Sequence, residues 1–325
     1  MQAQSKLANK TNLDITVRPL RETELATADS IMRLAFGTFI GLPEPMSFMG
    51  DATFVGTRWL VDPAAAFAAE SDGRLVGSNF ATNWGSVGFF GPLTIHPEFW
   101  DRGVGKLLME PIMECFDNWQ TRHAGLFTFP HSAKHVGLYQ RFGFWPRFLT
   151  ALMSKPIEQK PSSSSWSTFS AVPSGERDTV LNACREVTDA VYEGLDLTRE
   201  IQTAADHKLG DTVLLWDNNR LVALAVCHMG PGTEAGSGVC FIKFGAVRPG
   251  PGEEANFDHL VDACERMASA RQLSRLVGGV NTARHEAYRR MLTRGFKTDM
   301  QGLVMSRPNE AGYNRPGVYV IDDWR

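Results

Sequence analysis

The sequence has almost no net charge and few cysteines, and each shortage excludes a class of function. Its 33 lysines and arginines are balanced by 36 acidic residues, for a formal net charge of -3. Such a chain has no bulk positive field to hold a polyanion, which argues against nucleic acid as its main partner. The five cysteines, at 115, 184, 227, 240 and 264, form no Cys-x-x-Cys pair. Their odd number and wide spacing indicate buried thiols in a reducing compartment, not a disulfide framework or a metal site.

A long apolar run is also missing. Leu75 to Ile95 carries no charge, but Asn79, Asn83 and Pro92 interrupt it, so that strands and a turn fit better than a membrane span. Residues 1–12 are polar and lack the apolar core of a signal peptide. We therefore expect a cytoplasmic protein without a membrane partner.

The length of 325 residues favours two domains. The clearest boundary is the segment PIEQKPSSSSWS, in which prolines and a serine run replace any apolar periodicity. We predict a first domain over 13–155, a linker over 156–165, and a second domain with a C-terminal tail over 166–325.

The first half is predicted to follow the order β-α-βββ-α-β-α-β. The helices are expected at 22–39, from 103 onward with a bend at Pro111, and at 132–142. The strands are expected at 15–20, 65–70, 74–84, 86–95, 124–129 and 144–154. The irregular stretch GLPEPMSFMG, residues 41–50, is a candidate border of a substrate pocket.

The second half repeats this order. A strand near Trp166 precedes a long helical region over 177–209, then strands at 211–217, 220–229 and 238–247. A helix with an apolar face from Phe257 to Ala268, a strand at 273–280, a helix at 283–294 and a strand at 296–306 follow. The two halves therefore look like copies of one α+β fold. Residues 308–325 are predicted to add an edge strand or a tail packed on the other half.

The most informative stretch is LTIHPEFWDRGVGKLL, residues 93–108, in which a strand ends at a proline and a glycine loop opens a helix. Gly103 and Gly105 allow backbone N–H groups to point into one concavity, and Arg102 and Lys106 add full positive charges. The loop is therefore a candidate pyrophosphate site. A tight turn that merely needs glycine is the alternative.

Together with SAKHVGLYQRFGF, residues 132–144, this loop resembles two motifs of the GNAT acyl-CoA N-acyltransferase superfamily in order and spacing. Gly103, Gly105, Tyr139, Gly143 and Phe144 match the family pattern. The sequence departs from it at Trp100, where the family has Gln or Arg, at Ser132, where it has Asn, and at His135, where it has Ala. The resemblance implies two tandem GNAT-like domains, each a mostly antiparallel twisted sheet flanked by helices.

The resemblance also implies the reaction: an amine attacks the thioester of acetyl-CoA directly, with acetyl-CoA as co-substrate and no metal. The backbone at Leu93 and Ile95 would pair with pantetheine and polarise the thioester carbonyl. Tyr139 would act as general acid toward the leaving thiolate, although a core aromatic with a satisfied hydroxyl is the alternative. The implied coenzyme-binding residues are Leu93, Thr94, Ile95, Arg102, Gly103, Val104, Gly105, Lys106 and Ser132.

The general base is left open. His131 is the tentative choice because an imidazole titrates near pH 6.5, and Glu70, His96, His135 or a chain of waters are alternatives. His131 and Thr94 together also allow a carboxylate site, as in the GNAT-like decarboxylases.

The second half carries weaker signals. Its loop GAVRPGPGEEANF places Glu253 and Glu254 where a phosphate would approach, and like charges repel. Asn281 and Tyr288 keep the family spacing, but Gly295-Phe296 lies three residues further on than in the first half. A degenerate copy that shapes the acceptor pocket or an interface is predicted, with a second coenzyme site as the alternative.

The expected function is therefore acetyl transfer to the primary amine of a small molecule. A protein N-acetyltransferase, a GNAT-like decarboxylase or S-acyltransferase, and a non-catalytic acyl-CoA sensor are the alternatives. The sequence leaves the acceptor and the oligomeric state open, a homodimer included.

Overall fold

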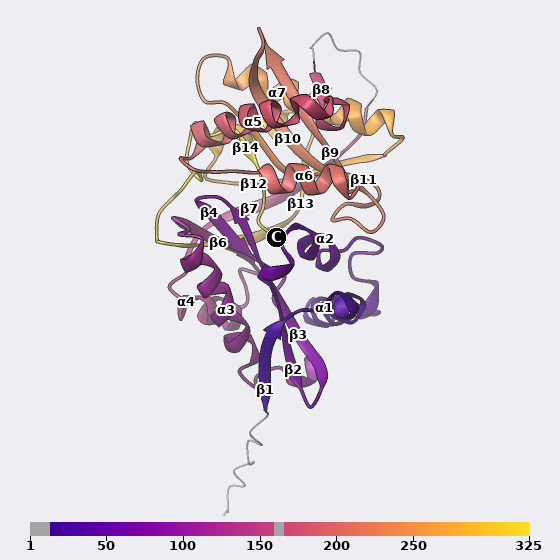
Figure 1. Cartoon of the computed structure of the whole chain (residues 1–325), viewed down its shortest axis with the longest axis vertical. Coiled ribbons are helices and arrows are strands. Elements are labelled where there is room, and N and C mark those ends of the chain that lie inside the picture. The colour runs from indigo at the N-terminus through magenta and orange to yellow at the C-terminus, as the bar shows by residue number, and fades with distance from the viewer. Residues whose placement is uncertain (1–13, 159–165) are drawn as a thin grey trace, which may run out of the picture.

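A computed structural model describes residues 14–158 and 166–325 (Figure 1). Residues 1–12, where no signal peptide is expected, and residues 159–165, the core of the expected linker, lie outside the described residues. Within the described ranges, no helix combines the length and apolar character needed to cross a membrane.

The first half contains nearly all the elements that the sequence predicts. Its strands are β1 (Ile15–Pro19), β2 (Ala66–Ser71), β3 (Arg74–Trp84), β4 (Val87–Phe90), β5 (Thr94–Ile95), β6 (His123–Thr128) and β7 (Trp145–Pro156). Its helices are α1 (Leu25–Phe39), α2 (Val55–Val61), α3 (Val104–Asn118) and α4 (Ala133–Gln140). The single strand expected at 86–95 is interrupted and forms β4 and β5. Helix α3 runs through Pro111 as one helix, and α2 was not predicted.

The second half repeats the arrangement. Its strands are β8 (Trp166–Thr168), β9 (Gly210–Asp217), β10 (Arg220–Gly230), β11 (Gly236–Val247), β12 (Arg275–Asn281), β13 (Lys297–Arg307) and β14 (Val320–Ile321). Its helices are α5 (Arg177–Val191), α6 (Thr198–Asp206), α7 (Glu253–Ala270) and α8 (His285–Thr293). The single helical region predicted over 177–209 is wrong: it is two helices, because the chain turns at Gly194 with a positive φ of 79°.

In the described residues the strands join into one 14-stranded sheet in which the two halves exchange their last strands. The central order is β6-β13-β7-β12, so that β13 of the second half lies between β6 and β7 of the first. Most neighbours are antiparallel, and the pairs β4–β6 and β11–β12 are parallel. The proposed division at 156–165 stays a prediction, because β7, which precedes it, belongs by pairing to the sheet of the second half.

Helices cover both faces of the sheet in each half (Figure 1). In the first half, α3 and α4 pack on one side and α1 and α2 on the other. In the second half, α7 and α8 share a core on one face, while α5 and α6 share a core on the opposite face. Four of the five cysteines are buried and Cys115 is half-buried, as the sequence predicts.

A buried cluster of charged groups joins the halves. Arg58 of α2 pairs with Glu234, in the loop after β10, at 2.9 Å. Glu234 also accepts from Lys243 of β11 at 2.8 Å, and Lys243 lies 3.0 Å from Glu200 of α6. Burial alone would raise the pKa of Glu234, but Arg58 and Lys243 together hold that pKa well below its usual value. The cluster therefore compensates its own charges, and removal of one member would leave an uncompensated buried charge.

The C-terminal tail fulfils both sequence expectations. Its strand β14 pairs with β11 of the second half. Beyond β14, the Trp324 ring stacks 6.5 Å from Phe89 of β4 and lies 5.9 Å from His123 of β6, both in the first half. In Figure 1 this end of the chain lies between the two halves, beside α2.

Two buried histidines predict how stability depends on pH. Burial lowers the pKa of His123 and of His228 to about 4, and nearby Arg147 and Lys243 act in the same direction. Both imidazoles stay neutral in the folded protein but take up a proton in the unfolded chain below about pH 6.5. Stability is therefore lost as the pH falls from about 6.5 toward 4, by about 1.4 kcal/mol per pH unit for each histidine.

Urea unfolding at pH 7, 6 and 5 measures this slope. His123→Phe should remove about half of it, whereas the matched change at the exposed His259 should leave it unchanged. A free energy of unfolding that is constant from pH 7 to 5 would contradict the assignment.

Candidate active site

A cavity of about 1380 Å³ opens in the first half and collects most of the predicted site residues. Its wall is built from the end of β4, from β5, from the loop that opens α3, from α4 and from α1. Every predicted coenzyme-binding residue except Ser132 lines it, and Tyr139 does as well.

The loop between β5 and α3 is held in place by Trp100, one of the three residues that depart from the family pattern. The indole N–H of Trp100 donates to the carbonyl oxygen of Ile95 at 2.8 Å, which ties the loop back to β5. Gly103 caps α3 with a positive φ of 82°, a conformation that favours glycine. The Ile95 carbonyl thus already accepts one hydrogen bond.

The start of α3 has the properties of an anion site. The first N–H groups of a helix carry partial positive charge, and here the residues from Arg102 to Lys106 line the cavity. A Cβ on Gly105 would lie 3.3 Å from Ile95 and from Leu138 of α4. Glycine at this position therefore lets α3 approach both walls, as a tight turn requires.

Tyr139 is a buried aromatic residue of the core that also lines the cavity. Its ring packs edge-on against Phe90, with the ring centroids 5.5 Å apart, and its side chain is buried. Burial raises the pKa of Tyr139 to about 12, and a hydrogen bond with Thr128 acts in the opposite direction. The residue is thus a core aromatic whose phenol stays protonated and lines the cavity.

The other candidate residues are less central. Ser132 caps α4, where its hydroxyl accepts from the N–H of His135 at 3.4 Å. His131 is exposed and its ring stacks 5.9 Å from Phe39, outside the residues that line the cavity. The structure therefore does not bring His131 into the cavity that Thr94 lines. Thr94 instead shares a hydrogen bond with Ser78 at 3.3 Å.

Of the remaining candidates for the general base, only His135 lines the cavity. Glu70 is paired with Arg18 at 2.5 Å, and His96 accepts from the N–H of Glu98 at the start of a short turn. His135 lines the cavity. Burial lowers the pKa of His135, and Lys134 and His131 lower it further, so the imidazole is neutral at pH 7.

The sequence predicted part of the far wall of the cavity, because Phe48 belongs to residues 41–50, which were expected to border a pocket. Phe36 and Phe39 of α1 also line this wall and were not predicted. Met300 and Trp324 come from β13 and the tail. The spacing of the phenylalanines on α1 offered a signal, but nothing local in the sequence places the tail here.

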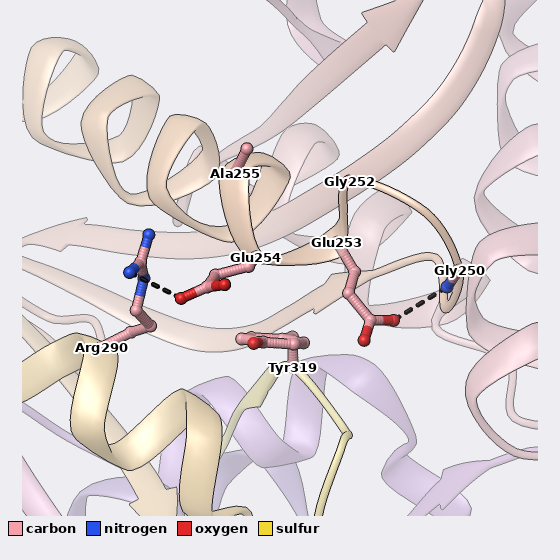
Figure 2. Close-up of a pocket in the computed structure, with 7 residues that line it drawn as sticks. All are labelled: Gly250, Gly252, Glu253, Glu254, Ala255, Arg290 and Tyr319. Carbon is pink, nitrogen blue, oxygen red and sulfur yellow. Dashed lines mark hydrogen bonds and ion pairs between the residues drawn. The ribbon is translucent and has the colours of Figure 1, made fainter.

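The second half has a counterpart of the glycine loop that opens α3, but acidic side chains replace the basic ones (Figure 2). Gly252 caps α7 with a positive φ of 84°, close to that of Gly103. The carboxylate of Glu253 accepts from the N–H of Gly250 at 2.8 Å, and Glu254 pairs with Arg290 at 2.7 Å above the ring of Tyr319. These groups surround a cavity of about 510 Å³. The protein's own carboxylates thus occupy the end of α7 that would attract a phosphate.

Comparison with known proteins connects this geometry to a family. Residues 31–144 match the model of the acetyltransferase (GNAT) family. No curated protein matches the chain in sequence.

Solved structures share the fold at low identity. A putative acetyltransferase from Pyrococcus horikoshii has a TM-score of 0.66 at 13% identity, over 100% of this chain and 99% of that chain. A GCN5-related N-acetyltransferase from Sphaerobacter thermophilus has a TM-score of 0.56 at 14% identity, over 90% of this chain and 95% of that chain. A tandem GNAT protein from the clavulanic acid biosynthesis pathway has a TM-score of 0.55 at 13% identity, over 90% of this chain and 98% of that chain.

The structural matches cover both halves and establish the fold, while the family model covers the loop and helices around the cavity. The α+β fold predicted from the sequence is thereby confirmed. Residues 31–144 thus match the GNAT acetyltransferase family, and the chain as a whole shares the fold of a tandem GNAT protein.

Proposed function

We propose that this acyltransferase moves an acetyl group from acetyl-CoA to the primary amine of a small molecule. The observation that carries the proposal is the presence in one cavity of an anion-binding helix start and a protonated phenol, at Arg102–Lys106 and Tyr139. The positive φ of Gly103 and the two cations fit the pyrophosphate of coenzyme A.

In this mechanism the chain positions the reactants and moves protons. The amine nitrogen forms a bond to the thioester carbon, and the carbon–sulfur bond breaks. Backbone groups at Leu93 and Ile95 would orient the thioester, which lowers the entropic part of the barrier. Tyr139 would donate its proton to the leaving thiolate. A phenol with a pKa of about 12 remains protonated at neutral and mildly alkaline pH, so its proton is available to the thiolate.

The proton lost by the amine needs a route to solvent. We propose His131 as the base. Because His135 lines the cavity while His131 is exposed, His135 would connect the amine in the cavity with His131. A neutral His135 can accept a proton and pass it outward. We further infer that the second half binds no coenzyme, since Glu253 and Glu254 would repel its phosphates, and that the protein works in the cytoplasm, with an acceptor amine as its partner.

Calorimetric titration with acetyl-CoA is expected to give one site per chain. The double variant Arg102→Glu, Lys106→Glu reverses two charges at the start of α3 and should weaken binding at least about tenfold. Both side chains are exposed, so the fold should be unaffected. Arg220→Glu, an exposed charge reversal on β10, is the control and should bind normally.

Two sites per chain would contradict the inference about the second half. No binding would remove the transferase proposal. Tighter binding of malonyl-CoA than of acetyl-CoA would instead favour the decarboxylase alternative.

Tyr139→Phe should lower kcat about 100-fold, because general acid catalysis contributes that much or more. The ring is retained against Phe90, so stability and the Kd for acetyl-CoA should change little. Release of free coenzyme A with the best amine of a panel measures kcat.

The same assay tests the pKa of the phenol. Since this pKa lies at about 12, kcat of the unmodified protein should not decline between pH 8 and about 10. An unchanged kcat in the Tyr139→Phe variant would show that Tyr139 serves packing alone.

A further inference from the structure

Part of the cavity wall is built from aromatic rings. Phe36 of α1 stacks on Phe48 with centroids 5.2 Å apart, and Phe39 lies 4.9 Å from Phe129. Phe36 and Phe129 are also 6.1 Å apart, so that the four rings form one cluster. We call these four residues the aromatic wall. All four line the cavity.

The aromatic wall shares its cavity with the proposed acid. Phe129 directly follows Thr128, whose side chain forms a hydrogen bond with Tyr139, and both Phe129 and Tyr139 line the cavity. A group held against the aromatic wall would therefore lie in the same cavity as the phenol.

Another part of the cavity wall is Trp324 of the tail, which is held by its packing. A Cβ on Gly125 of β6 would lie 2.0 Å from the Trp324 ring, so glycine there creates the space for the indole. The indole N–H of Trp324 donates to the Tyr313 hydroxyl at 2.9 Å, and the ring stacks on Phe89. A preformed apolar surface of this kind binds apolar groups without a large ordering cost.

The charges of the cavity argue against a polycationic acceptor. Among the described residues that line it, the only side-chain carboxylate is that of Asp101, which pairs with Lys134 at 2.6 Å. A polyamine or an aminoglycoside carries several positive charges and needs carboxylates to hold them. These lining residues offer such an acceptor no uncommitted side-chain carboxylate.

Building on the proposed function, we propose that the acceptor is a primary amine with an aromatic body, whose ring lies against Phe36, Phe39, Phe48 and Phe129. Ring pairs prefer edge-on or offset contacts at centroid distances of about 4.5–7 Å, and such pairs add about 0.5–1.5 kcal/mol beyond the burial of area. The rings of the aromatic wall lie 5.2 and 4.9 Å from one another, so that they form one aromatic surface for such a contact. A flexible aliphatic amine of equal size gains the burial but not the ring contacts.

The test compares phenethylamine and tryptamine with hexylamine, spermidine and a lysine peptide, with acetyl-CoA as donor and release of free coenzyme A as readout. The kcat/KM for the aromatic amines should exceed that for spermidine and the peptide at least about tenfold, which is the discrimination that a few ring contacts supply. Higher kcat/KM for spermidine or the peptide would overturn the proposal.

Two variants of Phe39 locate the effect. Phe39→Ala should raise KM for phenethylamine about tenfold, and Phe39→Leu should reduce the preference for phenethylamine over hexylamine, because leucine keeps apolar volume without a ring. The matched control is Phe148→Ala, which removes an exposed ring of β7 and should leave both values unchanged. An unchanged KM in Phe39→Ala would place the acceptor elsewhere and overturn the proposal.

Binding of the donor separates this proposal from the one on which it rests. Acetyl-CoA should bind Phe39→Ala and the unmodified protein equally. Octanoyl-CoA that binds more tightly than acetyl-CoA, with the gain lost in Phe39→Ala, would assign the aromatic wall to an acyl chain and overturn this inference while leaving acyl transfer intact. Binding of acetyl-CoA without turnover of any amine would overturn the proposed function and this inference with it.

Discussion

The exchange of last strands between the halves is the constraint on which the rest of the structure depends. Because β13 lies between β6 and β7, and β7 lies between β13 and β12, the backbone hydrogen bonds of these ladders run from one half to the other. Separation of the halves would leave whole strands with unpaired N–H and C=O groups, which is costly away from water. The two units therefore form one continuous sheet and not two domains joined by a linker alone.

This exchange also determines what reaches the cavity of the first half. Because β13 lies beside β6, the chain leaves β13 at the first half. It passes through β14 in the second half and then returns to the first half, where Trp324 packs on Gly125 and Phe89. The ion cluster of Arg58, Glu234 and Lys243 closes the same interface with buried charges. Such a cluster tolerates little displacement, since each charge depends on partners from the other half. The second half and its tail thus supply part of the cavity wall, through Met300, Trp324 and Arg325.

Local patterns explain how much of this could be predicted from the sequence. The turn at Gly103, the helix it opens and the placement of Tyr139 are set by residues close together in the chain, and the structure places them in one cavity as expected. Strand pairing is set by contacts between distant segments, and β propensity does not specify a partner. The exchange of β7 and β13 therefore left no local signal. The break between α5 and α6 was missed because apolar periodicity continues past Gly194, and His131 was favoured for its chemistry although its exposure could not be known.

The two glycine loops show why conformation alone does not make a coenzyme site. Gly103 and Gly252 adopt nearly the same φ, 82° and 84°, and each opens a helix after a buried strand. The first turn of α3 holds Lys106 and no acid, so its helix dipole and side chains add to one positive field. The first turn of α7 holds Glu253 and Glu254, which neutralise the same dipole and cap the loop through Gly250. Since the backbone geometry is shared, the difference in charge at these few positions decides which half can attract a phosphate.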